Sequence, residues 1–216
     1  MAQELKIQTP TPPMTPTTAQ ASRMTYEEFL EWADEDTWAE WVDGEVILLS
    51  PASKPHQDLM GFLSSLIRFF VEAKELGTVL TPPFQMKLST RPSGREPDLI
   101  FIAKEHLDRL KNTYLDGPAD LVIEIVSPES RARDRGDKFY EYEEAAVPEY
   151  WMLDQPRRQA EFYELGEDVR YHRIEIGDDG IFRSRVIKGL WLKVEWLWQD
   201  PLPTLMSVLK ERGLVK

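Results

Sequence analysis

Two stretches of the chain repeat apolar side chains at intervals of three and four residues, which is the pattern of an amphipathic helix. The first covers residues 56–76 and ends at Gly77, and the second covers residues 130–146 and ends before Pro148. Helix start and stop signals predict three shorter helices, at residues 25–33, 104–111 and 202–212.

The segments between these helices are short apolar runs bounded by turn residues, which is typical of strands. Asp43-Gly44 predicts a tight hairpin turn. Leu121–Val126 is apolar almost throughout, so we expect a central strand covered on both faces. Further strands are expected at residues 78–80, 84–88, 97–102 and 150–154, and an antiparallel meander at residues 159–165, 169–176, 181–186 and 192–196.

The alternation of helices and strands predicts one α/β domain over residues 24–216, with a mixed central sheet flanked by helices and a C-terminal β-meander and helix. Residues 1–23 differ in composition, because they contain four Pro and five Thr and show no apolar period. We predict a disordered N-terminal tail for residues 1–23, or alternatively an arm that becomes ordered on a partner subunit.

Residue counts exclude several classes of protein. The 216 residues include no cysteine, which rules out a disulfide scaffold, a thiolate zinc site and a cysteine nucleophile. With three histidines, a multi-histidine metal site is not expected. No apolar run approaches the roughly 20 residues of a membrane span, and no secretory signal pattern is present. We therefore expect a cytoplasmic protein without a membrane partner.

The net charge of −12 argues against a protein that simply coats nucleic acid. The charge is unevenly distributed, however, because residues 24–45 contain nine acidic residues and no lysine or arginine. Global acidity therefore weakens a DNA-binding hypothesis without excluding it.

Two carboxylates lie in or beside apolar strands. Glu124 lies within the run Leu121–Val126, where an unpaired ionised carboxylate costs several kcal/mol, so it must be paired, bound to a metal or exposed in a cleft. Asp98 follows Pro97 at the entrance of another apolar strand, a position that is also common in turns. Together, two acidic residues on neighbouring central strands form the hard-oxygen ligand set that Mg²⁺ or Mn²⁺ prefers.

A third group of polar residues lies on the predicted helix that follows Glu124. Asp134, Lys138 and Tyr142 are spaced four residues apart and share one face of that helix. The flanking residues 131–138 form a small basic island. A solvated helix face with salt bridges explains the same pattern, so the stripe alone leaves both interpretations open.

The order of these groups resembles the PD-(D/E)XK nuclease superfamily: Pro97-Asp98, then Glu124 after 26 residues, then a lysine on the following helix. More narrowly, the chain resembles the Uma2-type family of bacterial restriction endonucleases over about residues 25–165. The segments that support this resemblance are residues 40–45, 50–51 with His56, 96–99, 121–128, 134–142 and 147–154.

The resemblance implies a restriction-endonuclease-like α/β core and a Mg²⁺-dependent or Mn²⁺-dependent endonuclease that hydrolyses DNA phosphodiester bonds. Asp98 and Glu124 would be the metal ligands, joined by the backbone carbonyl of Ile125. Glu40, expected near the first helix and turn, would be the outer acidic residue. An active site of this kind lowers the pKa of a metal-bound water and screens the phosphate charge.

One position departs from the superfamily pattern. The lysine of the (D/E)XK triplet would lie two residues after Glu124, where this chain has Val126. The narrower family implies that Lys138, on the next helix, takes its place and orients the water or stabilises the charge of the transition state. Its ammonium should then point toward the Glu124 strand, whereas Tyr142 is expected to provide packing or support.

A different class of function competes with the enzyme. A catalytically weak or inactive nuclease-fold protein, acting as a dimeric nucleic-acid-binding or interaction module, agrees with Val126 and with the acidic net charge. In either case we expect a homodimer, because cutting both strands of a duplex needs two symmetry-related sites and because Trp191, Trp196 and Trp198 offer an aromatic face. His56 is expected to be a structural helix cap.

Overall fold

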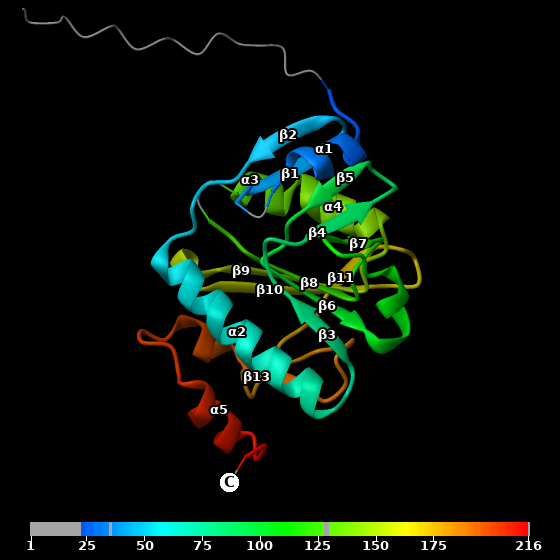
Figure 1. Ribbon diagram of the computed structural model, residues 1–216. Helices are drawn as coiled ribbons and strands as arrows, with labels where there is room; N and C mark the ends of the chain where they lie inside the picture. The colour runs from blue at the N-terminus through cyan, green and yellow to red at the C-terminus, as the bar shows by residue number, and fades with distance from the viewer. Residues whose placement is uncertain (1–22, 35, 128–129, 216) are drawn as a thin grey trace, which may run out of the picture.

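Figure 1 shows the computed structural model, in which two β-sheets and the helices are stacked in layers. The structure describes residues 23–34, 36–127 and 130–215. The predicted tail therefore lies outside the described residues, except for Arg23. The five-stranded sheet is at the top of the view, the six-stranded sheet crosses the middle, and α2 and the C-terminal segment lie below.

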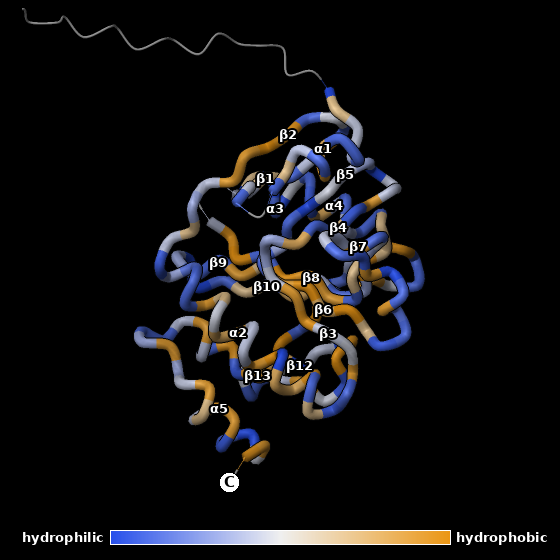
Figure 2. Tube along the Cα trace, in the orientation of Figure 1, coloured by the Kyte–Doolittle hydropathy of each residue, from blue (hydrophilic) through white to orange (hydrophobic). Residues whose placement is uncertain are grey.

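The six-stranded sheet is mixed, as predicted, with the strand order β11-β10-β9-β8-β6-β3. β8 and β9 run parallel, whereas the other neighbours are antiparallel. The two central strands, β8 and β9, are buried along their length. In Figure 2, β6 and β8 stand out as apolar. The strands are β3 (Gly77–Leu80), β6 (Leu99–Ala103), β8 (Leu121–Ile125), β9 (Glu149–Asp154), β10 (Gln159–Leu165) and β11 (Tyr171–Arg173).

The five-stranded sheet has the order β2-β1-β5-β4-β7. Asp43 and Gly44 form the predicted hairpin turn with φ values of 46° and 86°, the left-handed conformation that such a turn needs. β5 and β7 were not predicted, because each has three residues and no apolar run. The strands are β1 (Ala39–Val42), β2 (Glu45–Leu48), β4 (Gln85–Leu88), β5 (Ser93–Arg95) and β7 (Tyr114–Asp116).

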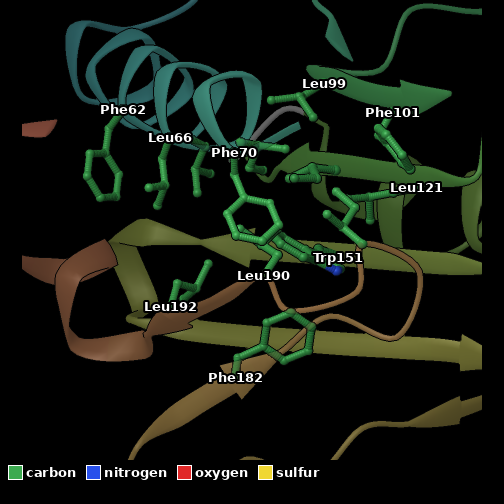
Figure 3. Close-up of a cluster of buried hydrophobic side chains, with 14 of the residues drawn as sticks. Phe62, Leu66, Phe70, Leu99, Phe101, Leu121, Trp151, Phe182, Leu190 and Leu192 are labelled. Carbon is green, nitrogen blue, oxygen red and sulfur yellow. The ribbon is translucent and has the colours of Figure 1, made fainter. Parts of the chain in front are cut away.

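Helix α2 (Lys54–Ala73) covers one face of the six-stranded sheet. Phe62, Leu66 and Phe70 project from it toward the sheet, where Trp151 lies in the centre of the cluster (Figure 3). The periodic apolar side chains of α2 are thus buried on one side of the helix, as the sequence predicted. The shorter α1 (Tyr26–Trp32) has the capping box of Thr25 and Glu28 and packs on the five-stranded sheet with Tyr26 and Phe29.

The opposite face of the six-stranded sheet forms a second core with β4, β7 and α4. Leu121, Ile123 and Ile125 of β8 face α2, whereas Val122 and Val126 belong to this second core. Because side chains alternate along a strand, Glu124 points to the same side as Val122, toward the five-stranded sheet.

The single helix predicted at residues 130–146 is wrong, because the chain forms two helices there, α3 (Arg131–Arg135) and α4 (Asp137–Glu144). Gly136 between them adopts φ −114° and ψ −97°, outside the helical region. A Cβ atom at this position would lie 2.7 Å from the carbonyl oxygen of Ala132. Glycine therefore permits a sharp change of direction between the two helices.

The predicted meander is divided between two sheets. β10 and β11 extend the six-stranded sheet, whereas β12 (Ile181–Arg183) pairs with β13 (Trp191–Lys193) in a separate two-stranded sheet. The last predicted strand is mostly the 3-10 helix η3 (Val194–Trp198), and a helix follows at α5 (Leu205–Glu211). A further 3-10 helix, η1 (Lys104–Arg109), replaces the short helix expected at residues 104–111.

The expected aromatic dimer face is not exposed. Trp196 is buried, and Trp191 and Trp198 pack against the core, because β13 and η3 close the layer beneath α2. The exposed large apolar side chains of the described residues include Trp32 and Leu48, far from the tryptophan-rich segment in the chain. No described helix combines the length and the apolar character needed to cross a bilayer.

A buried carboxylate attaches the C-terminal layer to the central sheet. Glu149 Oε1 accepts a hydrogen bond from Trp151 Nε1 at 2.6 Å. Its Oε2 accepts from Ser184 Oγ at 3.1 Å and from the backbone N–H groups of Arg185 and Val186 at 2.6 and 2.9 Å. Four donors from two chain segments, β9 and residues 184–186, thus converge on one side chain.

Replacing Glu149 with Gln should lower the free energy of unfolding by about 2–4 kcal/mol, because an amide offers one acceptor oxygen and turns two donors toward buried donors. Denaturant unfolding measures the change. The control is Glu164→Gln, which removes a partly exposed ion pair with Arg185 and should cost less than about 1 kcal/mol. Equal effects of the two substitutions would contradict the anchoring role.

Candidate active site

The two carboxylates on neighbouring central strands face each other. Leu99 of β6 pairs with Ile123 of β8 in an antiparallel register. Continuing this register by one residue sets Asp98 opposite Glu124 on the same face of the sheet. The backbone N–H of Ile125 also donates to Asp98 Oδ2 at 2.7 Å, which ties the entrance of β6 to the end of β8.

Glu124 is 4% exposed and receives two hydrogen bonds on one oxygen. Lys138 Nζ donates to Glu124 Oε1 at 2.9 Å, and Tyr142 Oη donates to the same atom at 2.8 Å. Burial raises the pKa of Glu124 to about 8, with Lys138 opposing this rise and nearby carboxylates including Asp134 adding to it. The predicted stripe on α3 and α4 therefore faces the interior and not the solvent.

Lys138 is held by three carboxylates. Its Nζ lies 2.9 Å from Glu124 Oε1, 2.9 Å from Glu40 Oε1 and 3.7 Å from Asp134 Oδ1. Burial alone would lower the pKa of Lys138, but Glu124, Glu40 and Asp134 raise it above its usual value. The side chain is thus a buried ammonium, in the direction expected from the sequence, and its removal cannot be as harmless as that of a surface lysine.

Glu40 lies on strand β1, which follows the first helix and leads into the Asp43-Gly44 turn. It is completely buried, which would raise its pKa, but Lys138 and Arg95 lower that pKa to about 2. Arg95 Nη1 donates to Glu40 Oε2 at 2.9 Å, and its other nitrogens donate to Glu141 at 2.7 and 2.6 Å. Glu40 is therefore a fixed anion between two cations.

Sequence reasoning missed Arg95, since it belongs to the polar three-residue strand β5. The only signal was its position three residues before Asp98. It is almost fully buried, and its guanidinium links β1 to α4 through Glu40 and Glu141. Arg95 thus positions Glu40 by binding the carboxylate oxygen that does not contact Lys138.

Asp134 and His56 also reach this centre, although neither was predicted as a site residue. Asp134 is buried, and its Oδ2 accepts from Ser130 Oγ at 2.6 Å, while its Oδ1 has no hydrogen-bond partner among the described residues. His56 Nε2 lies 3.1 Å from Asp98 Oδ1. Burial by itself would lower the pKa of His56, but the contact with Asp98 raises it, and the resulting pKa is above the usual value for histidine.

The donor set fits a hard divalent cation in kind. Asp98 and Glu124 supply carboxylate oxygens, and Asp134 Oδ1 is a buried acceptor without a hydrogen-bond partner among the described residues. No group of three or more His, Cys, Asp or Glu side chains in the described ranges is arranged to hold a metal ion. A site made of two carboxylates and the Ile125 carbonyl has fewer protein side chains than such a group. It still suits Mg²⁺, because this ion usually keeps several water ligands.

The geometry defines a class of protein. Acidic residues from neighbouring central strands, a buried lysine from the next helix and an outer glutamate meet on one face of a mixed sheet, as in restriction-endonuclease-like α/β proteins. The sequence profile of the Uma2 family, described as "Putative restriction endonuclease", matches residues 26–195. The chain belongs to this family, as its sequence predicted.

Two further proteins resemble the chain. One is "Uncharacterized protein slr1290" of Synechocystis sp. (strain ATCC 27184 / PCC 6803 / Kazusa), 22% identical over 148 residues, which are 68% of this chain and 76% of that protein. The other is the crystal structure of a "putative nuclease belonging to DUF820" from Anabaena variabilis ATCC 29413. It aligns with a TM-score of 0.67 and 16% identity over 81% of this chain and 97% of that chain, which confirms the fold class.

The metal-free protein should lose stability as the pH rises. The pKa of Glu124 is about 8 in the folded state against an ordinary 4.5, so the folded protein keeps a proton that the unfolded chain releases. The free energy of unfolding should therefore fall between pH 4.5 and 8, by at most about 1.4 kcal/mol per pH unit for this group. Glu124→Gln cannot ionise and should flatten the slope.

Urea unfolding in chelator at several pH values between 5 and 8 provides the measurement. Some slope should persist in Glu124→Gln, because burial also raises the pKa of Glu96 to about 7. The exposed Glu175→Gln is the matched control and should keep the wild-type slope. A Glu124→Gln slope as steep as that of the wild type would show that Glu124 ionises without cost.

Proposed function

We propose that the protein is a metal-dependent endonuclease that hydrolyses DNA phosphodiester bonds. The observation that supports it is the 2.9 Å contact between Lys138 Nζ and Glu124 Oε1. The contact supports the proposal because it gives Glu124 a lysine neighbour from a different element, whereas the residue two positions after Glu124 is Val126. Membership of a family described as "Putative restriction endonuclease" agrees with the proposal.

In this proposal Asp98, Glu124 and the Ile125 carbonyl would hold Mg²⁺ or Mn²⁺. The bound cation would lower the pKa of a water ligand and neutralise phosphate charge. Lys138 would present its ammonium beside the carboxylates, where it can orient the water or stabilise developing negative charge. Glu40 would hold Lys138 in place, so that it acts as the outer acidic residue without touching the substrate.

The interaction module is the alternative function, and one observation favours it. Lys138 is 4% exposed and in contact with three carboxylates, so a phosphate must compete with them for its ammonium. The net charge of −12 points in the same direction. A folded protein that binds DNA but does not cleave it with any divalent cation would establish this alternative.

Plasmid cleavage with Mg²⁺ or Mn²⁺ tests the enzyme. Wild type should cut and should stop in chelator, while Glu124→Gln should lose at least about 100-fold in rate because a metal ligand loses its charge. Lys138→Met should lose a comparable factor, and Lys138→Arg should recover only part of it, since a planar guanidinium does not replace a compact ammonium. Single-stranded DNA and RNA substrates define the substrate class.

The matched control is Lys87→Met, which removes a lysine of strand β4 that pairs with Glu27 of α1. It should keep wild-type activity. Because Lys138→Met leaves buried carboxylates unpaired, its folding is checked by circular dichroism and urea unfolding at pH 6. Full activity of a folded Lys138→Met variant would contradict the role of Lys138.

We further propose a homodimer in the cytoplasm, on the argument that cutting both strands needs two symmetry-related sites. With the C-terminal tryptophans packed inward, the expected interface is elsewhere, and the exposed Trp32, Trp38 and Leu48 are candidates. Size-exclusion chromatography with light scattering at micromolar concentration should give twice the chain mass of 25.1 kDa. A monomer would contradict the dimer and restrict each molecule to one cut per encounter.

A further inference from the structure

The imidazole of His56 occupies a place between two elements of the candidate active site. His56 lies in the first turn of α2, and its Nε2 is 3.1 Å from Asp98 Oδ1. A hydrogen bond with the Ile125 backbone adds to this contact. Nδ1 has no hydrogen-bond partner in the described part of the chain, and Nε2 is the ring nitrogen that contacts the site. Nε2 therefore faces Asp98 Oδ1 at the entrance of β6, and the other oxygen of this carboxylate is bound to the backbone of Ile125 at the end of β8.

We propose that His56 is a positioning residue that holds the carboxylate of Asp98, beside the backbone of Ile125, in the orientation that receives the divalent cation. This inference rests on the proposed function, because it concerns the same cation. Asp98 is then fixed at both ends: Oδ1 by His56 and Oδ2 by the Ile125 N–H at 2.7 Å. Each carboxylate oxygen keeps a second lone pair, which remains available to a metal.

A capping role does not account for the imidazole. Ser53 is the N-cap of α2, and its Oγ accepts a hydrogen bond from the backbone N–H of His56 at 3.4 Å. Any side chain at this position would provide that N–H. The imidazole is instead mostly buried, and the helix that supports it is anchored by buried residues such as Leu59 and Leu63. The sequence interpretation of His56 as a helix cap therefore covers only its backbone.

Two substitutions of His56 that differ in side-chain length distinguish the positioning role from the capping role. The amide nitrogen of Gln can lie near the position of the imidazole Nε2, whereas that of Asn lies near Nδ1 and cannot contact Asp98. His56→Asn should therefore raise the Kd for Mn²⁺ by about tenfold or more, while His56→Gln should stay within about threefold of wild type. Calorimetry on metal-free protein with Mn²⁺ alone measures both, without any nucleic acid.

Cleavage kinetics give a second readout. In His56→Asn, raising Mn²⁺ should recover most of the lost rate, with KM for DNA unchanged, because His56 acts through Asp98 and not on the DNA. Urea unfolding reports whether each variant is folded. A role limited to stability would lower the unfolding midpoint of His56→Asn and leave its Kd for Mn²⁺ unchanged.

The chain offers a matched control. His106 Nδ1 lies 2.8 Å from Asp120 Oδ1 at the other end of β6, so His106→Ala breaks the same kind of pair outside the site. It should leave the Kd for Mn²⁺ unchanged. An unchanged or lower Kd in folded His56→Asn would overturn the inference alone, a lower value showing that His56 competes with the cation. Wild type that neither binds Mn²⁺ nor cleaves would overturn the inference together with the proposed function.

Discussion

The buried ammonium of Lys138 is the interaction on which the centre of this protein depends. Four carboxylates, Glu40, Asp98, Glu124 and Asp134, lie close enough to influence one another, and such a cluster would repel itself without a cation. Lys138 contacts three of them, and Arg95 holds Glu40 from the other side. Breaking a buried ion pair usually costs about 3–5 kcal/mol, so the cluster ties the two sheets and α4 together.

In the metal-free protein, part of the free-energy cost of burying these carboxylates remains uncompensated. The raised pKa of Glu124, about 8, shows that one lysine does not fully compensate the burial and the neighbouring charges. A divalent cation bound beside Glu124 would displace that proton and supply the missing positive charge. In the proposed function, stability and cation binding would then be linked: residues that make the metal-free fold less stable at neutral pH are the ones that would hold Mg²⁺ or Mn²⁺.

Particular elements show how far the sequence can be interpreted. The periodic helix α2, the apolar strand β8 and the Asp43-Gly44 turn were predictable, because each depends on neighbours a few residues away. Strand β5 was not, since its residues Ser93–Arg95 are buried only through pairing with β1 and β4. The break at Gly136 and the division of the meander were also missed, because both depend on packing partners distant in the chain.

For the site, the helix pattern alone left open whether the stripe with Lys138 faces the interior. The sequence by itself determined two carboxylates in apolar surroundings, one inside an apolar strand and one at the entrance of another. These follow from the cost of burying charge, which can be assessed from a single strand or helix. Only the tertiary structure decided that Glu40 reaches the centre from β1, that Arg95 fixes it, and that His56 contacts Asp98 from α2. The physical reason is that contacts between distant segments depend on strand register and on how layers pack, neither of which a local pattern specifies.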